Sequence, residues 1–160
     1  MGGQKIAPFL VFSTDILSMG LEAAAGLRFV TPFYWNANEK TAAWTKRWQE
    51  ATEYKHAPTL VHALAYESTM AYLAAVEEAG TFDSKAVNDK MRELPLNTQL
   101  IENARVRPED GTVVMDMHLV EVKSPDASES DNDIYNIVTT IPGDKVYEPL
   151  EESECYLVNP

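Results

Sequence analysis

Residues 27–36 constrain the fold of this chain more than any other stretch. The segment begins as an apolar strand and meets Pro32, which has no amide hydrogen to donate to a sheet ladder. Phe33, Tyr34 and Trp35 then follow in a row. Because successive side chains of a strand point to opposite faces, at least one of these rings must face a second surface. Either the strand lies between two helical layers, or it crosses between two lobes and its rings line a cleft.

The residues before this run predict one βαβ unit. Residues 6–12 are apolar and suit a buried parallel strand. Ser13, Thr14 or Asp15 can cap the helix that follows, and Gly26 closes it. A strand, a helix and a second strand in this spacing are expected to be parallel and right-handed.

Three helices are predicted after the aromatic run. Asn38 begins the first, which runs to about residue 54. Thr59 or Ala57 begins the second, which runs to about residue 79. Asp83 or Ser84 begins the third.

The second of these helices is apolar on nearly every side. Between Pro58 and Val76 its only charged residue is Glu67, which is typical of a helix buried on most of its surface. His62 and Tyr66 stand one turn apart near its N-terminus, where free N–H groups favour an anionic ligand group. The pair either contacts such a group or consists of a satisfied interior histidine and a core tyrosine. The spacing leaves both interpretations open.

The last third of the chain predicts strands. Asp110 and Gly111 form a hairpin-type turn. Residues 113–122 alternate as a strand, with a bulge or burial on both faces near its end. Residues 124–133 form a polar, acidic loop, and residues 135–141 alternate as a final strand.

Composition excludes several classes of function. The chain has 160 residues and a net charge of −12, from 13 basic and 25 acidic residues. This acidity argues against a nucleic-acid partner and against adsorption to an anionic membrane. The single cysteine, Cys155, excludes an internal disulfide and a multi-cysteine metal site.

Motifs for catalysis are missing from the sequence. It contains none of the patterns GxSxG, HExxH, GxGxxG or a P-loop. His56, His62 and His118 do not stand in a metal-ligand spacing. We therefore expect no enzyme activity, no metal and no cofactor.

Several separated motifs together indicate a family. They occur in the order Thr14-Asp15, Gly20-Leu21-Glu22-Ala23-Ala24, Gly26-Leu27, Thr31-Pro32-Phe33-Tyr34-Trp35, Pro58-Thr59, Asp110-Gly111, Leu119-Val120-Glu121-Val122-Lys123, Ile141-Pro142-Gly143-Asp144 and Cys155-Tyr156-Leu157-Val158. This set resembles the C-terminal part of the branched-chain amino-acid-binding family of ABC-transporter substrate-binding proteins, which are type I periplasmic binding proteins. The sequence departs from the family at Asn36, usually Asp, at Tyr156, usually Pro, and at His62, often Gln. The last departure bears on which ligand is bound.

The resemblance implies an α/β fold that is a portion of a two-lobed type I periplasmic binding protein, with parallel βαβ elements flanked by helices. Residues 1–34 and 113–160 would belong to the C-terminal lobe. Residues 35–112 would form a helical part of the N-terminal lobe. Family members are roughly twice as long and carry a secretion signal, so we expect this chain to be a fragment of a longer protein.

The implied function is extracytoplasmic solute binding for an ABC importer. In the full-length protein, the partners would be a small-molecule solute in the periplasm and a membrane permease. The helix N-terminus and the aromatic residues favour a carboxylate-bearing solute, such as a branched-chain or aromatic acid. The alternative is a ligand-sensing regulatory module on the same scaffold. The expected ligand-binding residues are Ser13, Thr14, Asp15, Tyr34, Trp35, His62 and Tyr66.

The fragment itself is expected to self-associate. Its nearly uncharged helix would expose a large apolar face, and its strands would lack neighbours. Copies could hide these surfaces by exchanging elements at the aromatic run.

Overall fold

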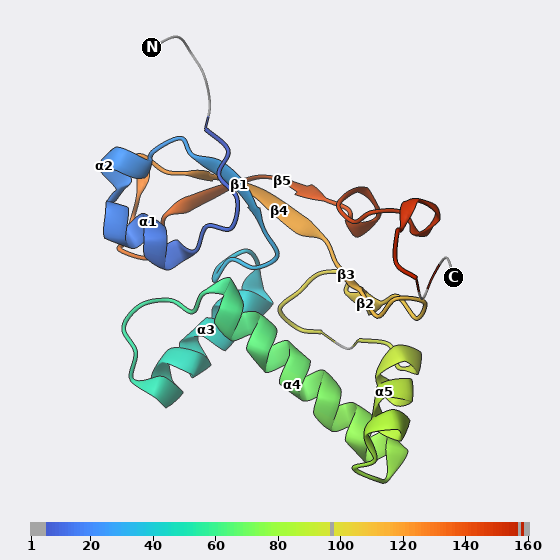
Figure 1. The fold of residues 1–160 in the computed structure, drawn as a ribbon. Coiled ribbons are helices and arrows are strands. Elements are labelled where there is room, and N and C mark those ends of the chain that lie inside the picture. The colour runs from blue at the N-terminus through green and yellow to red at the C-terminus, as the bar shows by residue number, and fades with distance from the viewer. Residues whose placement is uncertain (1–5, 97, 157, 159–160) are drawn as a thin grey trace.

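The computed structural model describes residues 6–96, 98–156 and 158 and is built around a small antiparallel sheet (Figure 1). The sheet has three strands in the order β1-β4-β5. They are β1 (Arg28–Thr31), β4 (Met117–Val122) and β5 (Tyr135–Ile141). Both neighbouring pairs are antiparallel.

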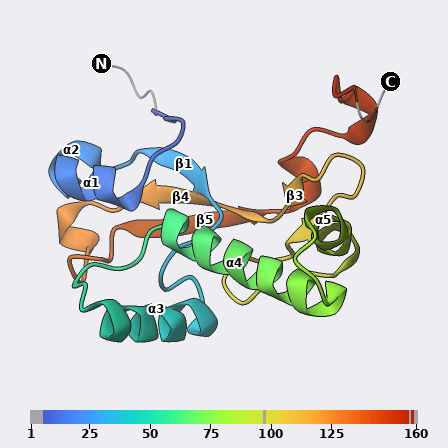
Figure 2. The same cartoon turned by 60° about the horizontal axis from the view of Figure 1, so that its bottom comes forward.

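Helices lie in two groups beside the sheet. The short helices α1 (Ser13–Met19) and α2 (Leu21–Ala24) lie together near one end of β1. Helices α3 (Glu39–Thr52), α4 (Leu60–Ala79) and α5 (Ser84–Glu93) extend below the sheet in Figure 1. In Figure 2, where the bottom of the molecule comes forward, α3 and α4 lie on the same side of the strands.

A second, two-stranded sheet is a hairpin. Strands β2 (Arg105–Val106) and β3 (Val113–Val114) pair antiparallel, and Gly111 takes a φ of 77° in the turn between them. Among the described residues, three short 3-10 helices lie in the last part of the chain. They span Pro125–Ala127, Gly143–Lys145 and Leu150–Glu152.

The helix boundaries follow from local capping. Asn38 Oδ1 accepts hydrogen bonds from the amides of Lys40 and Thr41 at 3.0 and 3.1 Å, which satisfies two free N–H groups of α3. Thr59 caps α4 in the same way, and Gly80 ends it with a left-handed φ of 62°. The predictions for these two helices are confirmed.

The predicted parallel strand over residues 6–12 is wrong, and with it the parallel βαβ unit. No strand forms there, and Phe9 and Leu10 are 99% and 81% exposed. The segment keeps one backbone bond to β1, from the amide of Arg28 to the carbonyl of Ile6 at 3.2 Å. A buried parallel strand needs neighbours and covering layers, and the described residues supply no second strand beside this one.

The predicted strand over residues 113–122 is interrupted at Met115 and Asp116, so it forms β3 and β4. The Asp116 carboxylate accepts hydrogen bonds from the Gly143 amide and the Asn103 side chain, at 2.8 and 2.7 Å. The pairing of β4 with β5 has a register shift between Leu119 and Val120, but its extra residue is Val138 of β5, so the bulge predicted for this strand lies in its partner.

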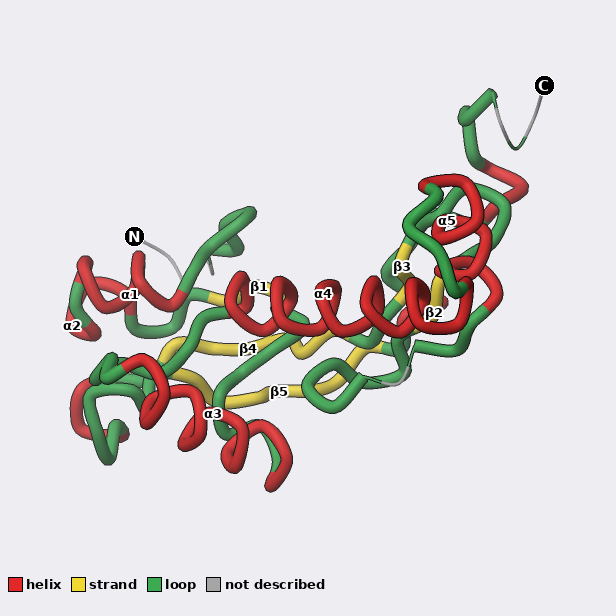
Figure 3. Tube along the Cα trace, turned by 90° about the horizontal axis from the view of Figure 1, so that it is seen from below, coloured by secondary structure: helices red, strands yellow, loops and turns green. Residues whose placement is uncertain are grey.

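Two hydrophobic cores divide the aromatic run between them. Tyr34 lies in the first core, which is formed by Ile16, Ala24, Phe29, Tyr34, Val120, Val122, Ile134 and Tyr135. Phe33 lies in the second core, which is formed by Phe33, Trp44, Ala63, Leu100, Ile101 and Met115. Trp35 packs against both. The expectation that one of the three rings must face a second surface is therefore met. Figure 3 shows the sheet of the first core beside the helices α3 and α4 of the second.

The N-cap of α3 gives a stability prediction. We expect Asn38→Ala to lower the free energy of unfolding by about 1 kcal/mol, because two helix amides lose their acceptor. Urea denaturation measures this change. Asn36→Ala is the matched control in the same loop, since Asn36 is exposed and its side chain has no hydrogen bond to a described residue. Equal losses in the two variants would contradict the role of Asn38 as the cap.

The β2–β3 hairpin gives a pH prediction. The Arg107 guanidinium and the Thr112 amide hydrogen-bond the Asp110 carboxylate, and they hold its pKa well below the ordinary value of 3.8. A depressed pKa contributes stability that is present above the ordinary value and is lost as the pH falls below it. Asp110→Asn should therefore lose less stability than the unaltered chain when acid unfolding is followed below about pH 4. Glu109→Gln, at the exposed neighbouring residue, should respond to acid as the unaltered chain does.

Candidate functional site

A small cavity lies where the two cores meet. Its volume is about 20 Å³, room for roughly one water molecule. Four segments that are far apart in the sequence form its wall. The lining residues are Val11, Ser13, Leu17, Phe29, Thr31, Phe33, Tyr34, Trp35, Ala57, Pro58, Thr59, Leu60, Asn132, Ile134 and Tyr135.

Tyr34 and Trp35 form one side of this cavity, and their polar atoms are bonded within the protein. The Tyr34 hydroxyl accepts hydrogen bonds from the amides of Ile134 and Tyr135 at 3.0 and 3.2 Å. It also donates to the Asn132 carbonyl at 3.1 Å, and Trp35 Nε1 donates to the same carbonyl at 2.7 Å. Burial raises the pKa of Tyr34 above its usual value, so the hydroxyl stays protonated and can donate. These two side chains fix the loop that leads into β5.

Asn132 connects this loop to the start of α4. Its side-chain Oδ1 accepts a hydrogen bond from the Ala57 amide at 2.9 Å. The N-cap Thr59 follows two residues later and lines the same cavity. The N-terminus of the 20-residue helix α4 therefore lies at the junction of the two cores.

Ser13, Thr14 and Asp15, the ligand-binding residues predicted at the start of α1, do not all reach the cavity. Ser13 is half-buried and lines the cavity. Thr14 is exposed, and so is Asp15. The Asp15 carboxylate accepts a hydrogen bond from the Phe12 amide at 2.9 Å, which caps α1.

His62 and Tyr66 lie away from the cavity. His62 is exposed, its Nδ1 accepts a hydrogen bond from the Thr59 amide at 3.0 Å, and its ring centroid lies 5.0 Å from that of Trp48. Tyr66 is half-buried, 5.5 Å from the Trp44 ring, and lines a groove of about 470 Å³ between α4 and α5. The structure brings Ser13, Tyr34 and Trp35 together at the cavity. His62 and Tyr66 do not line it.

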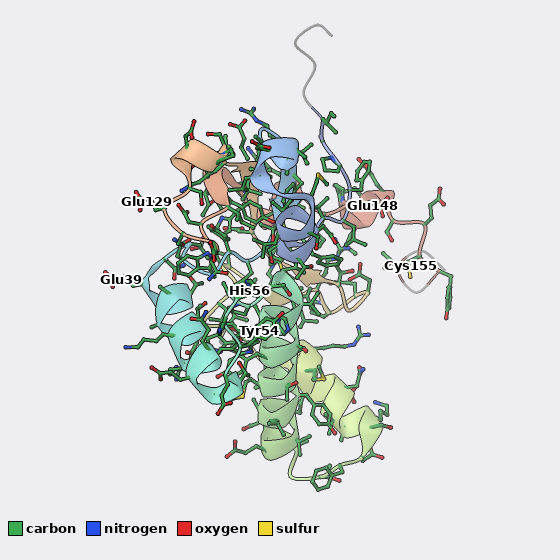
Figure 4. The ribbon with its side chains drawn as sticks, turned by 90° about the vertical axis from the view of Figure 1, so that its left-hand side faces the viewer. Glu39, Tyr54, His56, Glu129, Glu148 and Cys155 are labelled. Carbon is green, nitrogen blue, oxygen red and sulfur yellow. The ribbon has the colours of Figure 1, made fainter. Side chains whose placement is uncertain are left out.

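The His62 ring extends an aromatic row on the outside of α3 and α4. Trp48 contacts Tyr54 with ring centroids 5.7 Å apart, and Tyr54 contacts His56 at the same separation. Figure 4 labels Tyr54 and His56 beside the upper part of α4. Of the two interpretations of His62, the structure favours a satisfied histidine, but at the surface and not in the interior.

Sequence reasoning missed four polar residues of the cavity wall, which are Thr31, Thr59, Asn132 and Tyr135. Tyr135 is buried, and its hydroxyl is a buried polar atom without a hydrogen-bond partner among the described residues. Burial raises its pKa, with smaller contributions from Tyr34 and Asp15. No local signal marks Asn132 and Tyr135, because they reach the cavity through contacts about 100 residues away along the chain.

No helix among the described residues has both the length and the hydropathy of a membrane-crossing segment. The described residues also hold no cluster of three or more histidine, cysteine, aspartate and glutamate side chains suited to binding a metal ion.

Residues 1–130 match the family model of the periplasmic binding proteins. The chain belongs to this family, which confirms the resemblance recognised in the sequence motifs. Members of the family are solute-binding transport proteins. No curated protein matches the sequence.

Solved structures agree with this assignment. A periplasmic binding protein from Burkholderia mallei is 32% identical, with a TM-score of 0.87 over 94% of this chain and 39% of that one. A branched-chain amino-acid ABC transporter periplasmic ligand-binding protein from Burkholderia xenovorans is 31% identical, with a TM-score of 0.88 over 97% of this chain and 41% of that one. The matches confirm that the fold is a portion of a two-lobed type I periplasmic binding protein. The chain spans about 40% of the length of these two relatives.

Tyr34 and Tyr135, whose tilted rings contact each other in the cavity wall, give a matched pair of variants. Their ring centroids lie 5.0 Å apart. Tyr34→Phe should lower the free energy of unfolding by about 1–3 kcal/mol, because it leaves two buried amides without their acceptor. Tyr135→Phe removes a hydroxyl that has no partner among the described residues, so stability should stay the same or rise. Thermal and urea unfolding of both variants test this, and a larger loss in Tyr135→Phe would contradict it.

Proposed function

We propose that this chain forms part of the solute-binding component of an ABC importer, which holds a small carboxylate-bearing solute between two lobes. The observation that carries the proposal is the convergence of Ser13, the aromatic run and the N-terminus of α4 on one cavity between two cores. Solute sites in two-domain α/β proteins lie at such junctions.

The chemistry of the cavity wall supports an acid as the solute. Most lining residues are apolar or aromatic, and the N-terminus of α4 presents a positive partial charge beside them. A branched-chain or aromatic acid has a matching apolar body and one carboxylate. The Ser13 hydroxyl has no hydrogen bond to a described residue, so it is free to contact the solute.

Relatives of known solute class support the same proposal. The Burkholderia xenovorans relative is a branched-chain amino-acid transporter protein. A leucine-binding protein from Thermotoga maritima and a solute-binding protein from Rhodopseudomonas palustris in complex with 3,4-dihydroxybenzoic acid share the fold, at 24% and 14% identity.

The size of the cavity restricts where a solute can bind. At about 20 Å³ it is far smaller than the roughly 300–1,000 Å³ of a typical ligand pocket. We infer that the described residues supply one wall of the site and that the cores must separate for a solute to enter. Residues 1–34 and 113–160 would move as part of one lobe, and residues 35–112 as part of the other. The periplasm and a membrane permease remain the proposed location and partner.

Calorimetric titration tests the solute class. The chain, and any longer product that contains it, is titrated with leucine, with 3,4-dihydroxybenzoate and with glucose. We expect at least one of the two acids to bind to a product that contains both lobes. We expect glucose not to bind. Tight binding of glucose without binding of either acid would contradict the proposal.

Ser13→Ala tests the site itself. Loss of one hydrogen bond should weaken binding of the acid by about 0.5–1.5 kcal/mol. Ser18→Ala is the matched control, because Ser18 lies on the same helix, is exposed and does not line the cavity. If the two variants bind the acid with equal affinity, the prediction that Ser13 contacts the solute is wrong.

A further inference from the structure

The two edges of the three-stranded sheet differ in how well they are protected. An exposed edge strand presents unpaired N–H and C=O groups to which another strand can add. Strand β1 has several features that prevent this. It has only four residues, carries the charged Arg28 and is followed by Pro32. The Arg28 amide is also bonded to the Ile6 carbonyl.

Strand β5 lacks most of these features. Its seven residues, Tyr-Asn-Ile-Val-Thr-Thr-Ile, include no charge, no proline and no glycine. All residues from Asn136 to Thr140 are exposed. Five of the seven are β-branched residues, which favour extended pairing: Ile137, Val138, Thr139, Thr140 and Ile141. Among the described residues, no amide from Asn136 to Ile141 has a backbone partner outside β4.

Strand β5 is protected by a bulge near its middle and by Pro142, which follows its last residue. Leu119 is opposite Thr139 and Val120 is opposite Ile137, so Val138 is the extra residue without a partner in β4. The bulge interrupts the free edge at its middle, which weakens any added ladder without removing it. Because Val138 has no partner in β4, a substitution there should disturb the pairing of β4 with β5 less than one at a paired residue of β5.

We propose that β5 pairs antiparallel with β5 of a second copy of this chain, about a twofold axis near Val138. A second copy fits this edge better than a disordered peptide, because β5 is already ordered by β4. A free peptide would lose about 1–2 kcal/mol of backbone entropy for each residue it ordered. The twofold arrangement is self-complementary and closes, so it gives a dimer and not a fibre.

Charge also favours this edge as the contact between copies. The chain carries a net charge of −12, so two copies repel each other over most of their surface. Strand β5 contributes no charge to that repulsion. The acidic residues nearest its two ends are paired, Asp133 with Lys123 and Asp144 with Arg105.

The proposed dimer is weak. A strand of seven residues is about 24 Å long, and an edge contact on the order of 10 Å wide buries about 240 Å² on each copy. Stable interfaces bury about 800 Å² on each partner. The dimer should therefore form reversibly as the protein concentration rises. It is independent of the proposed solute.

Sedimentation of the purified 160-residue chain over a wide concentration range tests the proposal. The unaltered chain should show a monomer–dimer equilibrium. Val138→Lys should raise the dimer dissociation constant roughly tenfold or more, because it places two like charges at the twofold axis. Val30→Lys is the matched control: Val30 is 48% exposed on β1, against 46% for Val138, and this variant should dimerise as the unaltered chain does.

The exposed face of α4 is an alternative contact between two copies, so it is tested with its own variant. Helix α4 exposes Leu73 at 52% in a stretch without charge, so Leu73→Lys tests that face. If Leu73→Lys abolishes the dimer and Val138→Lys does not, the proposal is overturned. A monomer at every concentration also overturns it.

Hydrogen exchange of the unaltered chain gives a measurement that does not depend on the folding of any variant. Amides of residues 136–141 should exchange more slowly as the concentration rises, whereas those of β1 should not change. Unchanged exchange in β5 at a concentration where the dimer is populated would contradict the pairing.

Discussion

The division of three consecutive aromatic rings between two cores is the constraint on which the rest of the structure depends. Phe33 packs edge-on against Trp44 in one core, with ring centroids 5.8 Å apart. Tyr34 packs against Tyr135 in the other, at 5.0 Å. Trp35 contacts both cores. Because Pro32 ends the strand immediately before these residues, the chain leaves the sheet at a fixed place and the two cores share a narrow boundary.

Local signals in the sequence were sufficient to place the helices. Asn38 and Thr59 at the N-caps and Gly80 at the end of α4 act within one turn of their own position, so their effect can be read from neighbouring residues. The strand predicted over residues 6–12 failed for the opposite reason. Its apolar composition indicates that burial would be favourable, but burial depends on neighbouring strands that only the three-dimensional structure can show.

The candidate site was predictable only in part. Ser13, Tyr34 and Trp35 come together because they lie beside the ends of segments that meet at the core boundary. The helical position of His62 was predicted correctly, but the direction of its ring was not, since the capping bond to Thr59 and the contact with Trp48 determine that direction. Asn132 reaches the cavity only through contacts that are distant in sequence, which periodicity does not reveal.

Asn132 connects two sides of the cavity, because its backbone oxygen and its side-chain oxygen accept hydrogen bonds from different segments. Its backbone carbonyl holds Tyr34 and Trp35, whereas its side-chain oxygen holds the Ala57 amide just before α4. If residues 35–112 moved away from the first core as proposed, the bond to Tyr34 would be kept and the bonds to Trp35 and Ala57 would break. Each hydrogen bond contributes only about 0.5–1.5 kcal/mol. These two bonds are therefore weak compared with the packing inside either core.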